Sequence, residues 1–460
     1  MEKYILILAA GKGTRMKSAL PKVLHEAVYH PLLFYVLNAA REVGATEICT
    51  VVGHGAEEVK AAFEGQTSFV LQREQKGTGH AVREGLSALE ERREGTVLVL
   101  CGDTPLLRGE TLKALCEHHE KEGAAVTVMT ASLEDPFGYG RIVRNENGTL
   151  LRIVEQRDAS EEERAIREIN SGVYCFDLGF LRDAVSRLNT DNDQGELYLT
   201  DTIAIANQDG KKALAFAIDD FEEVQGINDR VQLAAAAKVL RRRKAEELMR
   251  DGVTLIDPDS TVIDPLAVVG EDTVIEPFTV IKGNTVIGKN CHIGPDTELR
   301  DSTLGDHVTF WRSVATEAKV GDFGNIGPFA YLRPKTELLD HVKVGDFVEV
   351  KNSTIGSGSK LPHLTYIGDS DVGSRCNIAC GTITCNYDGF NKTRSTIGDN
   401  VFVGCNVNLV SPVTVDNGAY IAAGSTITRD VPRDALAVAR EKQSIKEGWA
   451  ENFRNRNKKD

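Results

Sequence analysis

The stretch "VIEPFTVIKGNTVIGKNCHIG", residues 274–294, carries an aliphatic residue at every sixth position: Ile275, Ile281, Ile287 and Ile293. Neither an α-helix nor an isolated strand has a period of six. A coil of short strands that turns after each hexad does have this period. The stretch therefore predicts a parallel β-helix with an aliphatic interior.

The same spacing recurs through the C-terminal half of the chain. Its positions are Ile263, Val269, Ile275, Ile281, Ile287, Ile293 and Leu299, then Val320, Ile326, Leu332, Leu338, Val344 and Val350, then Ile355, Leu361 and Ile367, and finally Ile397, Val403, Leu409, Val415, Ile421 and Ile427. The segment "CNYDGFNKTRST", residues 385–396, interrupts the register. A loop inserted into a solenoid is typical of a binding element.

The N-terminal half has a different pattern. Apolar strands such as "YILILAA", "EICTVVG", "TVLVLCGD" and "AVTVMTA" alternate with helical stretches such as "PLLFYVLNAAREVGA". This alternation predicts an α/β domain with a parallel or mixed sheet covered by helices, whose ligands bind beyond the carboxyl ends of the strands. Residues 228–250, rich in Ala, Leu, Lys and Arg, predict one long linker helix. We therefore expect domains at 1–227 and 251–460, joined by 228–250, with a polar C-terminal tail.

Composition narrows the class of function. The chain has 460 residues, 41% hydrophobic and 27% charged, which is typical of a globular protein with two or three domains. Its net charge of -14 argues against nucleic acid or an anionic membrane as a partner. No apolar run is long enough to span a membrane, and the nine cysteines are scattered without paired spacing. We expect a cytoplasmic protein.

A phosphate-binding loop is predicted directly after the first strand. Gly11 and Gly13 permit a tight turn with exposed N–H groups, and Arg15 and Lys22 can neutralise a triphosphate. The loop matches neither common glycine-rich nucleotide motif, so a plain strand-to-helix turn stays open as an alternative. Asp103, at the end of another strand, is a suitable ligand for a hard metal ion, the alternative being a helix cap.

Four polar residues flank the aliphatic positions of the repeat and should point outward: Arg333, Lys351, Tyr366 and Asn377. If three hexads close one coil, Arg333 and Lys351, eighteen residues apart, stack on adjacent rungs at about 4.8 Å. Directly opposed like charges destabilise a sheet, so this arrangement favours a bound anion such as a sugar phosphate. Compensation by Glu349 is the alternative.

A histidine lies near these residues. His363, in "KLPHLTYIGDSDVG", falls between the two cations and Asn377 in the sequence. A single loop histidine is usually a surface residue, but the neighbouring candidate ligands favour a general base.

The N-terminal motifs resemble those of the sugar-phosphate nucleotidyltransferase family. They are "LAAGKGTRM", "LPK", "QKGTGHA", "CGDTPLL", "FGYGRIV", "IVEQRDA", "EINSGVY" and "GINDRVQLA". The resemblance implies a Rossmann-like domain in which a nucleoside triphosphate and a sugar 1-phosphate react by in-line displacement, releasing pyrophosphate. It assigns Mg²⁺ to Asp103 and Asn228. It assigns UTP and UDP-sugar binding to Leu8, Ala9, Ala10, Gly11, Arg15, Lys22, Gln72, Gly77, Thr78, Gly140, Glu155, Asn170 and Asn228.

The C-terminal motifs resemble the acetyltransferase half of the bifunctional UDP-N-acetylglucosamine pyrophosphorylase and glucosamine-1-phosphate N-acetyltransferase family. They are "LRPKTEL", "GDFVEVKNSTIG", "HLTYIGD", "GTITCNYDG", "VFVGCNVNLVSPV" and "AYIAAGSTIT". The resemblance implies a left-handed β-helix, a homotrimer, acetyl-CoA and UTP as co-substrates, and a product used for cell-envelope precursors. It makes His363 the catalytic base. It assigns glucosamine 1-phosphate to Arg333, Lys351, Tyr366 and Asn377, and acetyl-CoA to Cys380, Asn386, Tyr387, Cys405, Ala423 and Arg440.

The sequence departs from the family pattern at two places, and two alternative functions stay open. Cys405 stands where members often carry Ser, and Ala379-Cys380 where they often carry Gly-Ala. The alternatives are a single-activity nucleotidyltransferase with an allosteric β-helix and a non-catalytic assembly subunit. The intact phosphate loop disfavours the second alternative, and the polar set around His363 disfavours the first.

Overall fold

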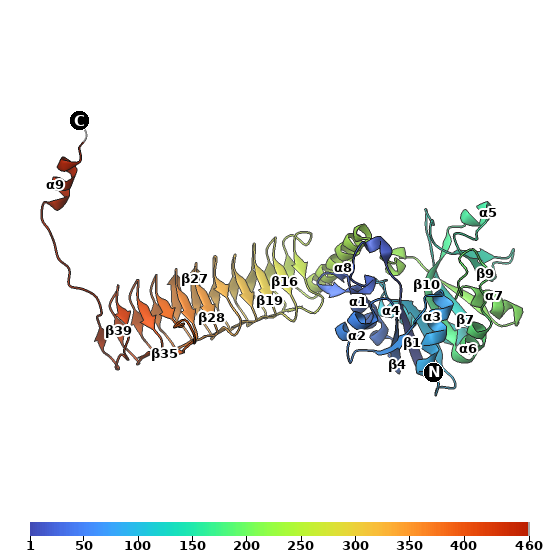
Figure 1. Cartoon of the computed structure of the whole chain (residues 1–460), viewed down its shortest axis with the longest axis horizontal. Coiled ribbons are helices and arrows are strands. Elements are labelled where there is room, and N and C mark those ends of the chain that lie inside the picture. The colour runs from blue at the N-terminus through green and yellow to red at the C-terminus, as the bar shows by residue number, and fades with distance from the viewer. Residues whose placement is uncertain (459–460) are drawn as a thin grey trace. The chain divides into compact units, whose positions relative to one another are not determined.

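The structure is a computed structural model that describes residues 1–458, and the chain divides into two compact units, Met1–Leu240 and Arg241–Asp460. Figure 1 shows one unit built of helices around a sheet and another built of short strands in successive coils. Each unit has its own hydrophobic core. Within residues 1–458, none of the helices combines the length and apolar character needed to cross a membrane.

The first unit contains a mixed sheet, as the alternating pattern predicts. The strand order is β11-β7-β10-β6-β1-β4-β5, and β10 runs antiparallel to both its neighbours. The strands are β1 Lys3–Ala9, β4 Glu47–Val52, β5 Ser68–Leu71, β6 Thr96–Cys101, β7 Val126–Ser132, β10 Glu168–Asp177 and β11 Ala213–Ile218. Outside this order, β8 Arg141–Arg144 pairs with β10 and with β9 Leu150–Val154, and β2 Glu26–Ala27 and β3 His30–Pro31 form a separate pair. The helices are α1 Leu32–Glu42, α2 Ala56–Ala62, α3 Thr78–Gly85, α4 Gly109–Glu122, α5 Glu161–Arg164, α6 Leu178–Ser186 and α7 Asp201–Gln208.

Both faces of this sheet are buried. In β1, Tyr4 and Leu6 belong to one hydrophobic cluster, while Ile5 and Ile7 belong to another. Successive strand residues point to opposite faces, so an uninterrupted apolar strand requires a packed layer on each side. Because β1 pairs in parallel with both β4 and β6, the carboxyl ends of these strands meet at one edge of the sheet.

The second unit is a β-helix of three parallel sheets, as the period of six predicts. The first face contains β12 Thr254–Leu255, β15 Val274–Ile275, β18 His292–Ile293, β21 Thr309–Phe310, β24 Asn325–Ile326, β27 Lys343–Asp346, β30 Lys360–His363, β33 Asn377–Ile378, β36 Phe402–Val403, β39 Tyr420–Ile421 and β41 Leu436–Ala437. The second contains β13 Val262–Ile263, β16 Val280–Lys282, β19 Glu298–Arg300, β22 Val314–Thr316, β25 Tyr331–Leu332, β28 Glu349–Lys351, β31 Tyr366–Gly368, β34 Ile383–Cys385, β37 Asn408–Val410 and β40 Thr426–Ile427. The third contains β14 Val268–Val269, β17 Val286–Ile287, β20 Thr303–Leu304, β23 Lys319–Val320, β26 Glu337–Leu338, β29 Thr354–Ile355, β32 Ser370–Val372, β35 Ser395–Ile397 and β38 Thr414–Val415.

The predicted aliphatic positions form the interior of the coils, where all are buried. The gap in the sequence pattern between Leu299 and Val320 is no gap in the core. Leu304, Phe310 and Ala315 occupy the interior there, because several steps shorten from six residues to five. Some coils therefore advance by sixteen or seventeen residues instead of eighteen.

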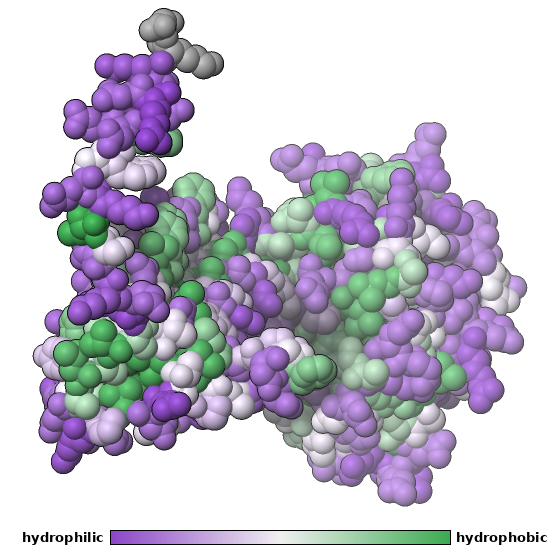
Figure 2. All heavy atoms as spheres, turned by 60° about the vertical axis from the view of Figure 1, so that its left-hand side comes forward, coloured by the Kyte–Doolittle hydropathy of each residue, from purple (hydrophilic) through white to green (hydrophobic). Residues whose placement is uncertain are grey.

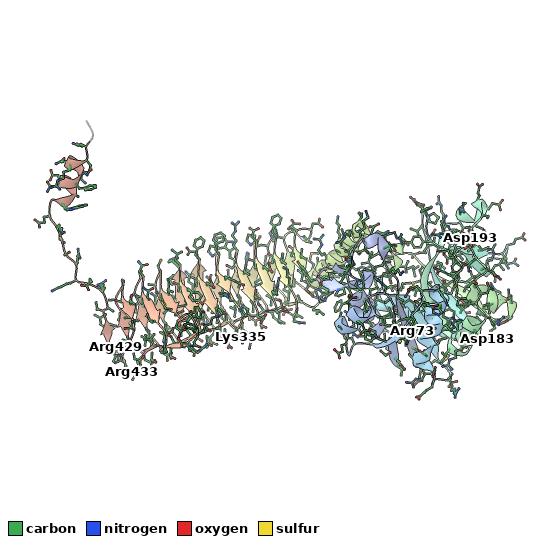
Figure 3. The ribbon with its side chains drawn as sticks, viewed as in Figure 1. Arg73, Asp183, Asp193, Lys335, Arg429 and Arg433 are labelled. Atoms are coloured by element: carbon green, nitrogen blue, oxygen red, sulfur yellow. The ribbon has the colours of Figure 1, made fainter. Side chains whose placement is uncertain are left out.

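The long predicted helix and the C-terminal tail complete the chain. Helix α8 spans Arg230–Arg250, and Ala245 and Leu248 near its end belong to the β-helix core. The tail contains helix α9, Trp449–Arg456, with no buried residue. Figure 2 shows apolar side chains exposed among polar ones on the surface, and in Figure 3 the side chains of Lys335, Arg429 and Arg433 project outward from the β-helix.

Candidate functional site

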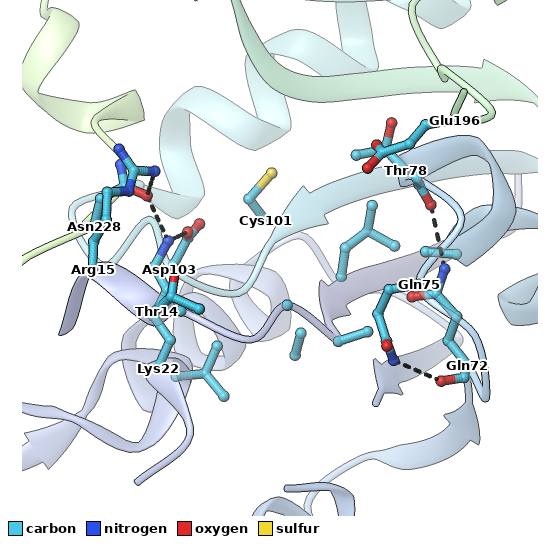
Figure 4. A pocket seen from close by; sticks show the side chains of 18 residues that line it. Thr14, Arg15, Lys22, Gln72, Gln75, Thr78, Cys101, Asp103, Glu196 and Asn228 are labelled. Atoms are coloured by element: carbon cyan, nitrogen blue, oxygen red, sulfur yellow. Dashed lines mark hydrogen bonds and ion pairs between the residues drawn. The ribbon is translucent and has the colours of Figure 1, made fainter. Parts of the chain in front are cut away.

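A cavity of about 380 Å³ opens beyond the carboxyl ends of β1 and β6, where the fold class predicts a ligand. Figure 4 shows its lining. The sequence-predicted residues that line it are Leu8, Ala9, Ala10, Gly11, Arg15, Lys22, Gln72, Gly77, Thr78, Asp103 and Asn228. Gly13 of the predicted phosphate-binding turn also lines it, and the residues that were not predicted are Thr14, Val23, Gln75, Ala81, Cys101 and Glu196. Glu196 lies in a loop outside the sequence motifs.

Two glycines shape the loops around the cavity. Gly13 has a left-handed backbone with φ +57°, and an added Cβ would lie 2.6 Å from Lys22 Cβ. Gly77, before α3, has φ +100°, and an added Cβ would lie 2.6 Å from the carbonyl oxygen of Leu197. Both positions require glycine, because an L side chain would be strained and would collide with a neighbour. The predicted turn therefore has a packing role as well as its expected phosphate role.

A cationic centre joins the residues predicted to bind phosphate and metal. The Lys22 ammonium group contacts Asp103 Oδ2 and donates to Asn228 Oδ1 at 2.8 Å, while Arg15 Nη2 donates to the same Asn228 oxygen at 2.7 Å. The Lys22 and Asp103 side chains are only 13% and 24% exposed, so solvent screens their interaction weakly. In Figure 4, the four side chains converge from separate elements.

Three other predicted residues gather beside β10. Asn170 N–H donates to the carbonyl of Gly140 at 2.9 Å, and a Cβ added at Gly140 would lie 3.4 Å from Glu155 Oε1. Burial raises the pKa of the Glu155 carboxyl group, and the carboxylates of Asp158 and Asp201 raise it further. A carboxyl group in such surroundings is suited to hydrogen bonding with a neutral, hydroxyl-rich ligand.

The β-helix stacks its two predicted cations as the eighteen-residue spacing requires. Arg333 N–H donates to Val350 O, which places Arg333 beside Lys351 on the next rung of the second face. Each cation also has an acidic neighbour: Arg333 Nη1 donates to Glu349 Oε1 at 2.6 Å, and Lys351 Nζ lies 3.7 Å from Asp369 Oδ2. The compensation by Glu349 that the sequence left open is therefore present alongside the stacking.

A buried polar network adjoins these cations. Asp369 accepts hydrogen bonds at 2.5 Å from both Asn352 Nδ2 and Asn386 Nδ2. Burial pushes the pKa of the Asp369 carboxyl group upward, but these hydrogen bonds and the Lys351 charge outweigh it and hold the pKa below its ordinary value. Asn386 Nδ2 also reaches the Tyr366 hydroxyl at 3.5 Å, so two predicted residues join this network.

Four further predicted residues form a line along the corner between the first and second faces. His363, Cys380, Cys405 and Ala423 each precede a turn residue, and main-chain hydrogen bonds stack these turns on successive rungs. The His363 side chain is 56% exposed and therefore accessible to a ligand. Arg440 Nη1 donates to Ala423 O at 2.6 Å, at the end of this line.

Two predicted residues lie apart from the others within one chain. Asn377 belongs to the first face, opposite Lys360 and Phe402, whereas Tyr366 belongs to the second. Tyr387 lies in the inserted segment, where it pairs with Lys392 across a short hairpin. A single chain therefore exposes the predicted acetyl-transfer residues on two faces.

Comparisons with known proteins match different families to the two halves of the chain. The family "MobA-like NTP transferase domain" matches residues 5–169, and "Bacterial transferase hexapeptide (six repeats)" matches 266–301 and 394–429. "Bifunctional protein GlmU" of Exiguobacterium sp. is 50% identical over 449 residues, 98% of this chain and 99% of the relative. The proteins of that name from Trichlorobacter lovleyi and Geobacillus thermodenitrificans are 53% identical (96% of this chain, 97% of the relative) and 49% identical (100% of each). The chain therefore belongs to the GlmU family of bifunctional transferases, in which one polypeptide joins a nucleotidyltransferase to a hexapeptide acetyltransferase.

Proposed function

We propose that this chain makes UDP-N-acetylglucosamine in two steps. The β-helix unit transfers an acetyl group from acetyl-CoA to the amine of glucosamine 1-phosphate. The α/β unit transfers a uridylyl group from UTP to N-acetylglucosamine 1-phosphate and releases pyrophosphate. One observation carries this proposal. The chain aligns with a bifunctional protein over 98% of its length, and each of its two units contains a separate polar site.

The domain division follows from this assignment. We place uridylyl transfer in residues 1–227, a linker in 228–250 and acetyl transfer in 251–460. The change from an open mixed sheet to stacked coils supports the division, and helix α8 follows the sheet and precedes the coils in the chain.

The metal assigned to the first site is Mg²⁺, held by Asp103 and Asn228. The Lys22 ammonium group tests the fit: it contacts one oxygen of each residue, so these oxygens converge on a single cation. Carboxylate and amide oxygens are ligands that Mg²⁺ accepts. When bound, Mg²⁺ supplies positive charge to the triphosphate.

The residues of the chain itself then position the uridylyl transfer. The nucleotide lies against the main chain of residues 8–11 and against Gln72, Gly77 and Thr78. Arg15 and Lys22 neutralise the phosphates, which requires Lys22 to turn away from Asp103. The sugar phosphate lies against Gly140, Glu155 and Asn170, so that its phosphate oxygen attacks the α-phosphorus in line with the departing pyrophosphate.

In the acetyl transfer, His363 removes a proton from the amine as it attacks the thioester carbon. The carbonyl oxygen becomes an oxyanion that the main-chain N–H of Cys380 stabilises; within residues 1–458 this N–H has no other acceptor. The tetrahedral intermediate expels the coenzyme A sulfur, which takes up the proton. The phosphate is held by Arg333 and Lys351, and the sugar is oriented by Tyr366 and Asn377.

Coenzyme A follows the line of corner residues. Its proposed contacts beyond Cys380 are Asn386, Tyr387, Cys405, Ala423 and Arg440. A thiol at 405 is a weaker hydrogen-bond donor than the serine hydroxyl often found there, so we assign this position a packing contact. The stacking of its rung on those of His363 and Cys380 supports its place along the ligand.

A homotrimer is part of the proposal. Asn377 and Tyr366 lie on different faces of one chain, so a site that uses both is completed by a second copy. The exposed side chains of Phe329, Phe347 and Leu364 form an apolar edge between those faces, and the two phenylalanine rings stack at 5.4 Å. Burying such an edge favours association. We also place the enzyme in the cytoplasm, in agreement with nine free cysteines.

The test is product analysis by mass spectrometry. Glucosamine 1-phosphate, acetyl-CoA, UTP and Mg²⁺ should yield UDP-N-acetylglucosamine; a wild-type protein that forms neither product overturns the proposal. Asp103→Ala should abolish uridylyl transfer and leave acetyl transfer largely intact. His363→Ala should do the reverse, lowering acetyl transfer by about 10²–10⁴-fold. Equal loss of both activities in a folded variant contradicts independent sites.

A further inference from the structure

The partner of His363 is Asp346, a residue that the site motifs do not assign. His363 Nδ1 lies 2.5 Å from Asp346 Oδ1. The two residues are register partners at the ends of β27 and β30, one rung apart on the first face. Cross-strand neighbours of this kind are common in a β-helix. The contact between His363 and Asp346 differs in being short and in using Nδ1, the ring nitrogen nearer the main chain.

The local backbone explains why this pair meets. Strands β27 and β30 contain four residues each, whereas their neighbours on this face, β24 and β33, contain two. A Cβ added at Gly345 would lie 1.9 Å from the carbonyl oxygen of Pro362, so glycine permits a close approach that another residue would prevent. Leu364 N–H then donates to Asp346 O at 3.0 Å. The main chain thus holds Asp346 and His363 together on both sides of the contact.

In the contact between these two side chains, His363 donates the hydrogen bond and Asp346 accepts it. A hydrogen bond from His363, helped by the main-chain N–H of Asp346 itself, holds the pKa of the Asp346 carboxyl group below its ordinary value. An ionised carboxylate only accepts hydrogen bonds, so the proton of the neutral imidazole must be on Nδ1. The lone pair is then on Nε2, the outer ring nitrogen, where an amine proton can be taken up.

Other charged groups on these elements do not contact the ring. Lys343 and Lys360 lie near the beginnings of the same two strands, and Glu349, beyond the corner, is bound to Arg333. As a stabilising ion pair, the contact has little value, because the His363 and Asp346 side chains are 56% and 39% exposed. Its geometry is better suited to orienting the ring than to stabilising the fold.

We infer that Asp346 is a positioning residue for acetyl transfer, which fixes the Nδ1–H tautomer of His363 and stabilises the imidazolium formed when the amine proton is taken. The inference rests on the proposed role of His363 as the base. No bond to carbon changes at Asp346: the amine proton moves to Nε2 and then to the departing thiolate, and the carboxylate stays ionised throughout.

A matched control is present in the same face. His292 Nε2 lies 3.1 Å from Glu276 Oε1, again between adjacent rungs. This pair is far along the coil from the proposed site and uses the outer ring nitrogen. Glu276→Gln therefore removes a cross-rung histidine–carboxylate contact without touching His363.

The experiment measures the pH dependence of acetyl transfer by thiol release in the full-length protein. Asp346→Ala should lower kcat at least about tenfold and by no more than His363→Ala, with KM changed less than about threefold. The acidic limb of the kcat profile should move to lower pH, because the imidazolium loses its counter-charge. Asp346→Asn, which keeps an acceptor oxygen but no charge, should retain more activity and show the same displacement of the acidic limb.

Control measurements and the size of the effect decide the outcome. Unchanged thermal unfolding and unchanged uridylyl transfer in Asp346→Ala exclude misfolding, and Glu276→Gln should leave the acetyl profile at wild type. A wild-type kcat in Asp346→Ala, a loss confined to KM, or an unmoved acidic limb overturns the inference. If His363→Ala also keeps full activity, the proposed base is wrong; if only Asp346→Ala keeps it, the base stands and the positioning role fails.

Discussion

Replacing Lys22 by methionine should tighten divalent-metal binding in the nucleotide-free protein. Lys22 contacts Asp103 and donates to Asn228 at 2.8 Å, so its ammonium group competes for the same oxygens as the proposed metal. Methionine has a similar length but no charge. In the Lys22→Met variant, both oxygens lose their contact with the ammonium group.

The magnitude follows from the hydrogen bonds that the metal has to displace. A hydrogen bond to a charged group contributes about 1.5–3 kcal/mol, and both side chains are less than one quarter exposed, so screening removes little of this. Since about 1.4 kcal/mol corresponds to a factor of ten, a net loss equivalent to one such bond should lower the Kd about 10- to 100-fold. Some compensation by Arg15, which already donates to Asn228, sets the lower end.

The assay is a titration of Mn²⁺, followed by the electron paramagnetic resonance signal of the free ion, without nucleotide. Lys12→Met is the matched control, because Lys12 belongs to the same loop but is exposed and does not line the cavity. Asp103→Asn should abolish the site. Unchanged or weaker Mn²⁺ binding in Lys22→Met would refute the competition, whatever the activity of the variant.

Two other predictions concern pH and stability. Because burial and neighbouring carboxylates raise the pKa of Glu155 above its ordinary 4.5, the folded protein binds a proton more tightly there, and stability falls as pH rises through the interval between the two values. Glu155→Gln should therefore raise the Tm at pH 7 in calorimetry while weakening sugar-phosphate binding; a lower Tm contradicts this reading of the pKa. Burial lowers the pKa of His119 from 6.5 to about 4, so the unfolded chain binds the proton first and stability falls as pH drops from 6.5 to 4, by about 3 kcal/mol. Denaturant unfolding of His119→Gln at several pH values should show that part of the pH dependence removed, and an unchanged slope would count against it.

The β-helix was predictable because nearly every step places an apolar side chain in its interior, Thr384 being a buried polar exception. That constraint repeats in the sequence, so the pattern identifies both the fold and the outward direction of Arg333 and Lys351. The shortened steps were hidden, because Ala315 and Leu304 keep the core filled while breaking the count of six. A repeat is visible only where its spacing is constant.

The contacts between distant residues were beyond the sequence pattern. Lys22 is 81 residues from Asp103 and 206 from Asn228, and the parallel sheet, not local spacing, brings them together. Asp346 and His363 are seventeen residues apart, one fewer than three hexads, so the predicted eighteen-residue stacking did not pair them. The residues of both sites lay in recognisable motifs, but their partners depended on tertiary structure.

The second half of helix α8 has a consequence for how the molecule can be divided. A stack of coils has an open first layer, and Ala245 and Leu248 fill it from the helix. A fragment meant to work as an isolated acetyltransferase should therefore begin near Arg241 and include the second half of α8. A fragment that begins at the end of α8 would expose the apolar core of the first coil to solvent. The boundary between the two compact units thus falls inside helix α8, within the proposed linker, and an exchange of the β-helix unit should carry residues 241–250 with it.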